Sequence, residues 1–306
     1  MEEGVRVIAE KIRKLEVQGA RNVAIAAICA LQTLAETTKA MTRKDFIAQL
    51  CEARTLLFAS RETEPLMRNA IRWIITQVED SDERKVTELA NLVSSSSEKF
   101  QKSLAASNER TAEIGAKRIS DDSTIFTHCH SSTVIHMLAK AKGKGKTFEV
   151  ICTETRPAFQ GRITAKEMLK LGVKTTFIVD SAARSFMHDV DMVVVGADAI
   201  TSEGNVVNKI GSSTIAVLAR EARKPFYVVS ELLKFDPATL YGEYEKIEER
   251  SRDEIWREAP PELNVRNPAF DVTPRNLIHG IVCEEGIVSP QSVTEVLHRV
   301  YPWVFE

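Results

Sequence analysis

The feature that most constrains the fold is a change of hydrophobic period near residue 119 of this 306-residue chain. Before that point, apolar residues recur at helical spacing, as in Val5, Ile8 and Ile12. After it, short β-rich runs alternate with helical segments, which predicts crossover units and a mainly parallel sheet covered on both faces. We therefore expect an α/β protein with an N-terminal helical domain over 1–118 and a Rossmann-like domain over 119–306.

Six runs have the length and composition of strands: Thr124–Thr127, Phe148–Thr153, Thr175–Asp180, Met192–Gly196, Phe226–Ser230 and Gly280–Glu284. Four segments between them have helical patterns: Ser132–Ala141, Thr164–Leu171, Ala182–Asp189 and Gly211–Arg223. In the first domain, Thr42 with Asp45 resembles a capping box, Pro65 predicts another helix start, and 84–117 predicts one long helix. Ser292 predicts the cap of a last helix.

Composition narrows the class of function. A hydrophobic fraction of 43%, a charged fraction of 27% and a net charge of −2 are typical of a soluble globular protein without bulk attraction to nucleic acid or membrane. The chain shows no signal peptide, membrane-spanning run, dinucleotide-binding glycine fingerprint or Walker A sequence, so we expect a cytoplasmic protein that binds neither NAD nor ATP. Its five cysteines fit neither a disulfide framework nor a zinc pattern, and four of them are interpreted as buried structural thiols: Cys29, Cys51, Cys152 and Cys283.

Polar residues follow two of the predicted strands. Cys129 follows the first and Asp198 the fourth. Ligands bind at the carboxyl ends of strands in open α/β sheets, so a thiol and a carboxyl can meet there over one substrate. A helix start after Cys129, with protonated His128 or His130, would lower the pKa of the thiol. Burial would raise the pKa of Asp198 and keep it protonated as a general acid.

Both residues also have other interpretations. Cys129 can be a buried structural thiol, or a metal ligand together with His128 or His130. Adjacent strand residues point to opposite faces, so at most two of these three can share an ion. Asp198 can be a turn or helix-capping aspartate.

Several positions have the chemistry to bind anions. The segment 208–211 is predicted to open a helix whose amides, with Lys209, would bind a phosphate, and Lys234 follows another strand end. Either lysine alone is typical of a solvated surface residue. Glu154 and Arg156 can pair with each other or orient the substrate.

At these positions the chain resembles a superfamily that joins archaeal ribose-1,5-bisphosphate isomerase, methylthioribose-1-phosphate isomerase and the α, β and δ regulatory subunits of translation initiation factor 2B. The matching segments are Thr127–Ser131, Thr153–Pro157 with Gln160-Gly161, Val179–Ala183, Gly196–Asp198, Asn208–Gly211 and Asn267–Pro274. Regulatory subunits typically lack the cysteine, the aspartate or both. The methylthioribose enzyme usually follows its cysteine with Asn-Thr-Gly, whereas this chain has His130-Ser131-Ser132.

The resemblance implies an aldose–ketose isomerase that converts ribose 1,5-bisphosphate to ribulose 1,5-bisphosphate without a cofactor or metal, in archaeal nucleoside (AMP) salvage. It implies that Asp198 protonates the ring oxygen while Cys129 moves a proton from carbon 2 to carbon 1. It implies a homo-oligomer, either a dimer or a hexamer built of dimers, with the helical domain acting as a lid. The substrate-binding residues so implied are Gly19, Ala20, Arg21, Arg61, Ser131, Ser132, Thr133, Arg156, Gln160, Asn208, Lys209 and Lys234. The alternatives are methylthioribose-1-phosphate isomerase and a non-catalytic regulatory subunit.

Overall fold

The computed structural model describes residues 3–61 and 63–306 and divides the chain into two compact units. One unit runs to Ala106 and includes Tyr301–Glu306, and the other is Ser107–Val300. The expected boundary near residue 118 lies just beyond helix α5 (Val86–Ala116), within which the two units divide. This helix runs unbroken for 31 residues, as predicted for 84–117.

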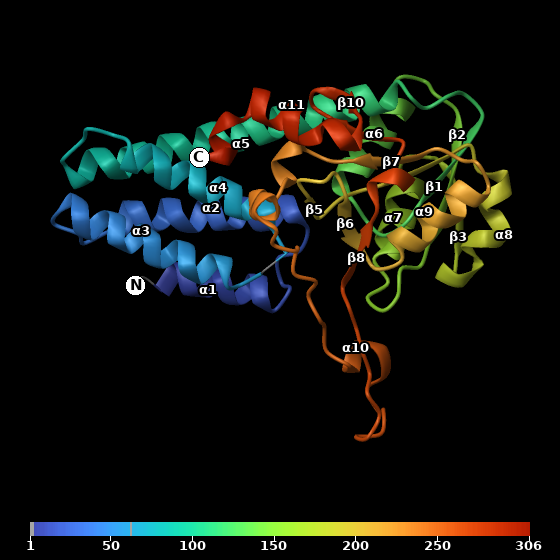
Figure 1. Ribbon diagram of the computed structural model, residues 1–306, viewed down its shortest axis with the longest axis horizontal. Helices are drawn as coiled ribbons and strands as arrows, with labels where there is room; N and C mark the ends of the chain where they lie inside the picture. Colours follow the sequence, from blue (N-terminus) through green and yellow to red (C-terminus); the bar gives the residue numbers. More distant parts are fainter. Residues whose placement is uncertain (1–2, 62) are drawn as a thin grey trace. The chain divides into compact units, whose positions relative to one another are not determined.

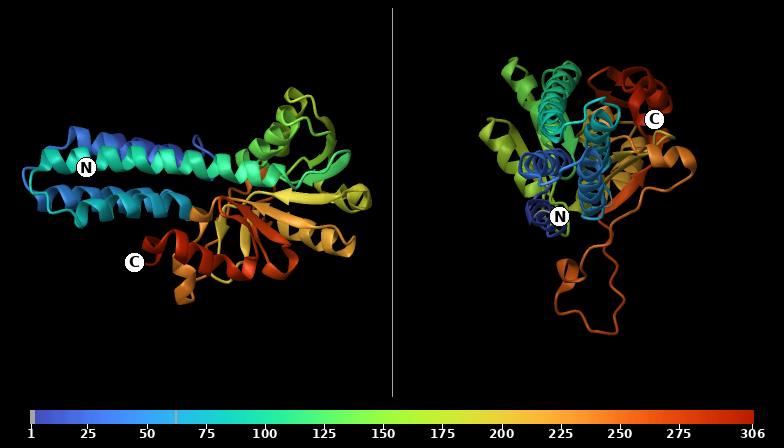
Figure 2. Two further views of the ribbon diagram at one scale, coloured as in Figure 1. Left: turned by 90° about the horizontal axis from the view of Figure 1, so that it is seen from above. Right: turned by 90° about the vertical axis from the view of Figure 1, so that its left-hand side faces the viewer.

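The helical unit contains four helices, the first part of α5 and a C-terminal 3₁₀ turn: α1 (Glu3–Arg13), α2 (Ala20–Thr37), α3 (Arg43–Phe58), α4 (Pro65–Glu79) and η7 (Pro302–Phe305). Figure 2 shows α2, α3, α4 and the first part of α5 running alongside one another. The predicted helix starts are confirmed, since the Thr42 hydroxyl accepts from the Asp45 amide and Pro65 is the first residue of α4. In the described part of the chain, no helix is both long and apolar enough to cross a membrane.

A seven-stranded sheet forms the centre of the second unit, in the order β10-β9-β7-β4-β1-β2-β3. Its strands are β1 (Ser123–Thr127), β2 (Phe148–Thr153), β3 (Lys174–Ile178), β4 (Met192–Val195), β7 (Phe226–Val229), β9 (Gly280–Cys283) and β10 (Gly286–Val288). All neighbours pair in parallel except β9 and β10. The predicted α/β class and the six predicted strands are therefore confirmed, and β10 is an addition.

Helices cover both faces of this sheet (Figure 1). They are α6 (Ser132–Gly143), α7 (Gly161–Lys170), α8 (Ala183–Phe186), α9 (Ser212–Glu221) and α11 (Val293–Val300). The end of α5, α6 and α7 pack on one face in a single hydrophobic core. The chain moves along the sheet in one direction from β1 to β3 and in the opposite direction from β4 to β9. Because the crossovers are right-handed, this reversal places α9 on the other face, against β4 and β7. The predicted helix 182–189 is divided into α8 and a 3₁₀ turn, η2 (Met187–Asp189).

A second, three-stranded sheet was not predicted. It consists of β5 (Ala199–Ile200), β6 (Val206–Lys209) and β8 (Phe270–Thr273), paired antiparallel. The prediction that Asn208 and Lys209 open a helix is therefore wrong: they end β6, and α9 begins at Ser212 with Gly211 as its N-cap. Local pattern misses such short strands because their partners are distant in sequence.

Ser292 ends a 3₁₀ turn, η6 (Pro290–Ser292), and directly precedes Val293, the first residue of α11, which is the position predicted for the cap. One further local prediction is wrong. Cys29 is exposed rather than buried, because it lies off the buried stripe of α2, and Cys51 is half-buried. Cys152 and Cys283 are buried as predicted.

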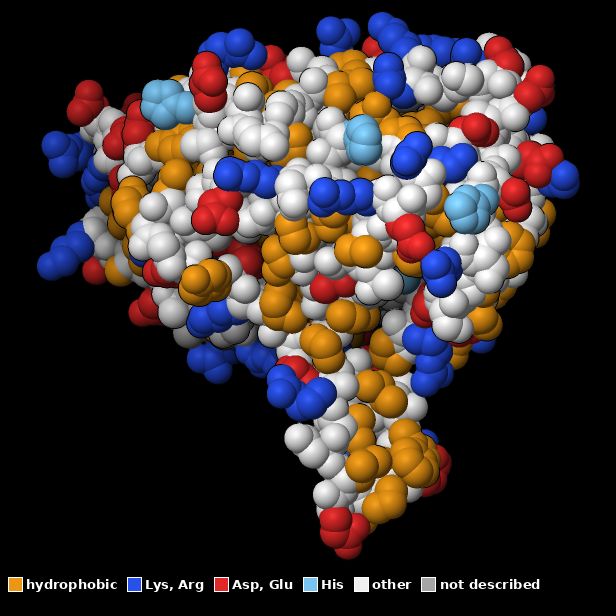
Figure 3. All heavy atoms as spheres, turned by 45° about the vertical axis from the view of Figure 1, so that its right-hand side comes forward, with side chains coloured by type: hydrophobic (Ala, Val, Ile, Leu, Met, Phe, Trp, Pro, Cys, Tyr) orange, Lys and Arg blue, Asp and Glu red, His pale blue; other side chains and the backbone are white. Residues whose placement is uncertain are grey.

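An arm over 243–268, which includes α10 (Asp253–Trp256), projects from the second unit between η4 (Pro237–Tyr241) and β8. Figure 3 shows hydrophobic side chains gathered on this projection. Tyr244 is 95% exposed and Trp256 is 49% exposed. An isolated antiparallel bridge between Glu249 and Pro268 joins the outgoing and returning segments of the arm.

Close packing where β2 leads into α7 can be tested at Gly161. A Cβ there would lie 1.7 Å from the Thr153 carbonyl oxygen, so the backbone must move to accept Gly161→Ala. We expect the free energy of unfolding to fall by about 2–4 kcal/mol, measured by urea denaturation. Gly143→Ala in α6 is the matched control, because a Cβ there meets nothing within 4 Å. Equal stability of the two variants would contradict this packing.

Candidate active site

The candidate catalytic residues flank the point where the strand order reverses. From β1 the chain proceeds outward through β2 and β3, and from β4 it proceeds outward on the other side through β7 and β9. Cys129 follows β1 and Asp198 follows β4, and these two strands are parallel neighbours. The crevice outside the carboxyl ends at such a switch point is the usual ligand site of an open α/β sheet. Here the ends approach closely, since a Cβ on Gly196 would lie 2.6 Å from the Ser131 Oγ.

The backbone of Cys129 adopts a left-handed conformation, with φ of 70°. Its N–H donates to the Thr155 Oγ1 at 2.9 Å, and its carbonyl oxygen accepts from the Thr164 Oγ1 at 2.8 Å. A non-glycine residue at positive φ is strained by roughly 1–3 kcal/mol and persists only when its surroundings fix it. Sequence reasoning missed a role for both threonines, although Thr155 belongs to one of the quoted motifs.

His128 and His130 are neutral. His128 is 2% exposed, and its Nε2 lies 2.8 Å from the Ile210 carbonyl oxygen while its Nδ1 lies 2.6 Å from the Thr153 Oγ1. Burial lowers the pKa of both imidazoles. The prediction that a protonated histidine lowers the pKa of Cys129 is therefore wrong. Among the described residues, no group of three His, Cys, Asp or Glu side chains is placed to hold a metal ion.

Burial also controls the thiol itself. It raises the pKa of Cys129 to about 11, and the Asp198 and Asp180 carboxylates act in the same direction. The Lys209 ammonium and the backbone N–H of His130, which donates to the sulfur, act against burial. The predicted low pKa is therefore wrong, since a thiol with this pKa is protonated at neutral pH.

The two candidate lysines are buried, contrary to the surface positions that are typical of single lysines. Lys209 is 7% exposed, with its Nζ 5.0 Å from the centroid of the Phe270 ring. Lys234 is 6% exposed, and its Nζ donates to the Ala197 carbonyl oxygen at 2.8 Å. That carbonyl precedes Asp198, a half-buried residue whose own N–H donates to β6. The structure therefore brings Cys129 and both lysines to the region of Asp198.

A buried polar network continues from Lys234 to the start of α6. The Lys234 Nζ lies 3.7 Å from the Glu231 Oε2, and Glu231 Oε1 accepts from the Asn108 Nδ2 at 3.0 Å. The same amide lies 3.3 Å from the Thr133 Oγ1. Sequence reasoning missed Asn108 and Glu231, because nothing local distinguishes them from surface polar residues.

The first turn of α6 is a further place for an anion. The Ser131 hydroxyl caps this helix by accepting from the Val134 N–H at 3.4 Å, and Ser132 and Thr133 are its first residues. Backbone amides at a helix start favour negative charge. The three predicted residues Ser131, Ser132 and Thr133 are thus placed next to Cys129.

The start of α9, in contrast, already holds an anion. The Asp271 carboxylate accepts from the N–H of Gly211 at 2.7 Å and from the N–H of Ser213 at 3.1 Å. The amides predicted to bind a substrate phosphate therefore bind a carboxylate of the chain itself. Asn208 is buried, with its Nδ2 donating to the Ser212 Oγ at 2.8 Å.

A cavity of about 370 Å³ lies between the strand ends and the arm. It is lined by His128, Arg156, Pro157, Asp180, Ile210, Gly211, Ile255, Arg266, Asn267 and Pro268. Arg156 is the one candidate residue in this lining, and its guanidinium also lies 5.1 Å from the Phe159 ring centroid. Gln160, the N-cap of α7, has a buried Oε1 that accepts no hydrogen bond from the residues that the structure describes.

The remaining candidates belong to the helical unit. Gly19 is the N-cap of α2 with φ of 85°, Ala20 is the first residue of that helix, and Arg21 is half-buried. Arg61 is 8% exposed, and its Nε lies 3.2 Å from the Glu64 Oε1. These four residues stay predictions for phosphate contacts.

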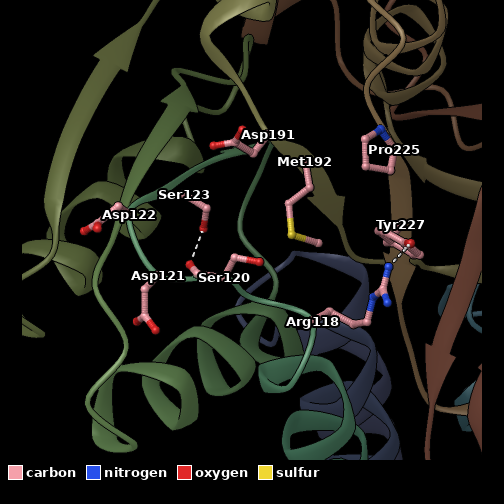
Figure 4. A pocket seen from close by; sticks show the side chains of 9 residues that line it. All are labelled: Arg118, Ser120, Asp121, Asp122, Ser123, Asp191, Met192, Pro225 and Tyr227. Atoms are coloured by element: carbon pink, nitrogen blue, oxygen red, sulfur yellow. Dashed lines mark hydrogen bonds between the residues drawn. The ribbon is translucent and has the colours of Figure 1, made fainter.

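A second cavity, of about 340 Å³, lies at the opposite, amino ends of β1, β4 and β7 (Figure 4). Three carboxylates line it (Asp121, Asp122 and Asp191), and the Arg118 Nη2 donates to the Tyr227 hydroxyl at 2.8 Å. Amino ends of parallel strands are not the usual ligand position, and the cavity contains no candidate residue.

The high thiol pKa can be tested by alkylation. With a pKa of about 11, about one part in a thousand of Cys129 is thiolate at pH 8. The rate of carboxamidomethylation at Cys129, followed by peptide mass spectrometry, should therefore still rise tenfold per pH unit between pH 8 and 10. Lys209→Gln should slow alkylation further and Lys209→Arg should not, because only the first removes the opposing cation. An alkylation rate that stops rising below pH 9 would contradict a Cys129 pKa of about 11.

Asp271 should make stability depend on pH. Burial raises its pKa from 3.8 to about 6, so the folded state favours the protonated acid. The associated stabilisation, about 3 kcal/mol, is present below pH 4 and lost as pH rises through 6. Relative to wild type, Asp271→Asn should therefore gain unfolding free energy between pH 4 and 7 in urea titrations. Asp189→Asn, at an exposed position, is the control, and its unfolding free energy should depend on pH as that of wild type does. Identical pH profiles for wild type and both variants would contradict a raised pKa of Asp271.

Comparison with known proteins places the chain in a family. Residues 16–290 match the model of the Initiation factor 2 subunit family. The chain is 39% identical over 298 residues to the ribose 1,5-bisphosphate isomerase of Methanocaldococcus jannaschii, covering 96% of this chain and 94% of that protein.

Two solved structures share the fold. One is the Pyrococcus horikoshii translation initiation factor eIF-2B, with a TM-score of 0.83, 30% identity, and coverage of 95% of this chain and 98% of the other. The other is the 5-methylthioribose 1-phosphate isomerase of the same organism, with a TM-score of 0.79, 30% identity, and coverage of 98% and 88%. The chain belongs to the Initiation factor 2 subunit family.

Proposed function

We propose that this chain is an aldose–ketose isomerase that converts ribose 1,5-bisphosphate to ribulose 1,5-bisphosphate. The observation that carries the proposal is the position of Cys129 and Asp198 on the two strands that flank the switch point. A regulatory subunit needs no thiol and carboxyl there. The relative at 39% identity, itself a ribose 1,5-bisphosphate isomerase, supports this substrate over the methylthio sugar.

The two residues have complementary roles in this reaction. The anomeric oxygen carries a phosphate, so the ring cannot open as a free aldose does. Cys129 takes the proton from carbon 2, those electrons form the bond to carbon 1, the bond from carbon 1 to the ring oxygen breaks, and Asp198 protonates that oxygen. The thiol then returns its proton to carbon 1, and the hydroxyl on carbon 2 gives its proton back to Asp198, which leaves the ketone.

The thiolate needed for the first step is not the resting form. Lys209 and the His130 amide favour thiolate, and burial opposes it. The reaction therefore depends on these two groups, and a site closed to water strengthens both interactions.

The phosphates require cations and amides on opposite sides of the sugar. In the second unit these are Lys209, Lys234 and the first turn of α6, with Arg156 lining the adjacent cavity. Arg61 and the segment 19–21 would complete the set when the helical unit closes as a lid. The proposal includes a cytoplasmic homo-oligomer whose ketose bisphosphate product is consumed by Rubisco in nucleoside salvage.

The function is tested by adding ribose 1,5-bisphosphate to the purified chain and coupling ketose formation to Rubisco. We expect turnover that falls by about 10²–10⁴-fold in Cys129→Ser and in Asp198→Asn, since each variant loses a proton-transfer group. Binding of the substrate, followed by calorimetry, should persist in both variants.

Other outcomes separate the alternatives. Turnover of methylthioribose 1-phosphate without turnover of the bisphosphate would assign the second isomerase activity. Ligand binding without turnover of either sugar would assign a regulatory subunit.

A further inference from the structure

Two hydrogen bonds hold the backbone of Cys129, one at its N–H and one at its carbonyl oxygen. Its N–H donates to Thr155, which follows β2, and its carbonyl oxygen accepts from Thr164 in α7. Thr155 is fully buried and Thr164 is 1% exposed, so water does not replace either hydroxyl. This arrangement fixes a conformation that a cysteine rarely adopts.

On the N–H side, the hydrogen bonds form a chain with one direction. His128 donates from Nε2 to the Ile210 carbonyl oxygen, so the Nδ1 of the neutral ring accepts from the Thr153 hydroxyl. The Thr153 hydroxyl proton is thus already donated to His128. The Thr155 hydroxyl therefore donates to the Thr153 hydroxyl oxygen, with 3.3 Å between the two oxygens. The Thr155 oxygen is left to accept from Cys129.

A second chain acts on the carbonyl side. The Thr164 hydroxyl donates its one proton to the Cys129 carbonyl oxygen. It therefore accepts from the Nδ1 of His130, 3.2 Å away. The two histidines that flank Cys129 in sequence thus support its two backbone groups, His128 through Thr153 and Thr155 and His130 through Thr164.

We propose that Thr155 and Thr164 are positioning residues that keep Cys129 left-handed, so that the His130 N–H reaches its sulfur when the proton moves. The inference rests on the proposed function for its kinetic readout. Neither threonine is assigned contact with the substrate. Without either hydroxyl, the backbone of Cys129 is free to turn to the common right-handed region. The sulfur then loses the hydrogen bond from the His130 N–H, which favours the thiolate.

The test uses Thr155→Val and Thr164→Val, which keep the shape of the side chain, with Thr155→Ser and Thr164→Ser as matched variants that keep the hydroxyl. We expect kcat for ribose 1,5-bisphosphate to fall about tenfold or more in each valine variant, with KM within about twofold and recovery in each serine variant. Thr175→Val, in β3, is the control and should match wild type, because its hydroxyl donates to the Val173 carbonyl oxygen, away from Cys129.

The pH dependence of Cys129 alkylation is the second readout, and it does not require catalysis. It should move to higher pH in both valine variants and stay in place in the serine and Thr175→Val variants. Wild-type kcat and alkylation in the valine variants would overturn the proposal, as would serine variants as impaired as the valine ones. If wild type does not isomerise the sugar, the proposed function fails, and alkylation alone decides whether the threonines position Cys129.

Discussion

The parallel pairing of β1 with β4 determines where chemistry can occur in this fold. Phe126 lies opposite Val193 in this pairing, and both strands are buried on both faces. Such a pair is rigid, and both of its chain exits leave at one edge. The crossover direction reverses between these strands, so the chain leads away from the space above them on both sides. A thiol and a carboxyl placed on the two exits therefore share one crevice.

Around this crevice, burial and charge act against each other. Burial keeps the Cys129 thiol protonated, while Lys209 favours the thiolate. The lysines are themselves retained in the interior by specific partners, the ring of Phe270 for one and the Ala197 carbonyl for the other. A ligand with two anionic ends suits such a site, because a buried ammonium is stabilised by an opposite charge that is also removed from water.

The fold class and the positions of the two candidate catalytic residues could be predicted from the sequence. The change of period predicted the α/β class, and the polar residues after two apolar runs predicted where Cys129 and Asp198 lie. The second sheet was not accessible, because β6 and β8 pair across a long loop. Without that sheet, neither the burial of Lys209 nor the capture of the α9 amides by Asp271 could be foreseen. Ionisation also escaped prediction, because it depends on how tightly the surrounding chain packs.

Under the proposed function, the left-handed backbone of Cys129 sets stability and activity in opposition at one position. Glycine adopts that conformation without strain, so replacing the cysteine by glycine removes this penalty of roughly 1–3 kcal/mol together with the thiol. Mutational drift that selected only for a more stable molecule would therefore discard the reactive group. Under the proposed function, the thiol is retained at this position for its chemistry, at the expense of the most relaxed backbone.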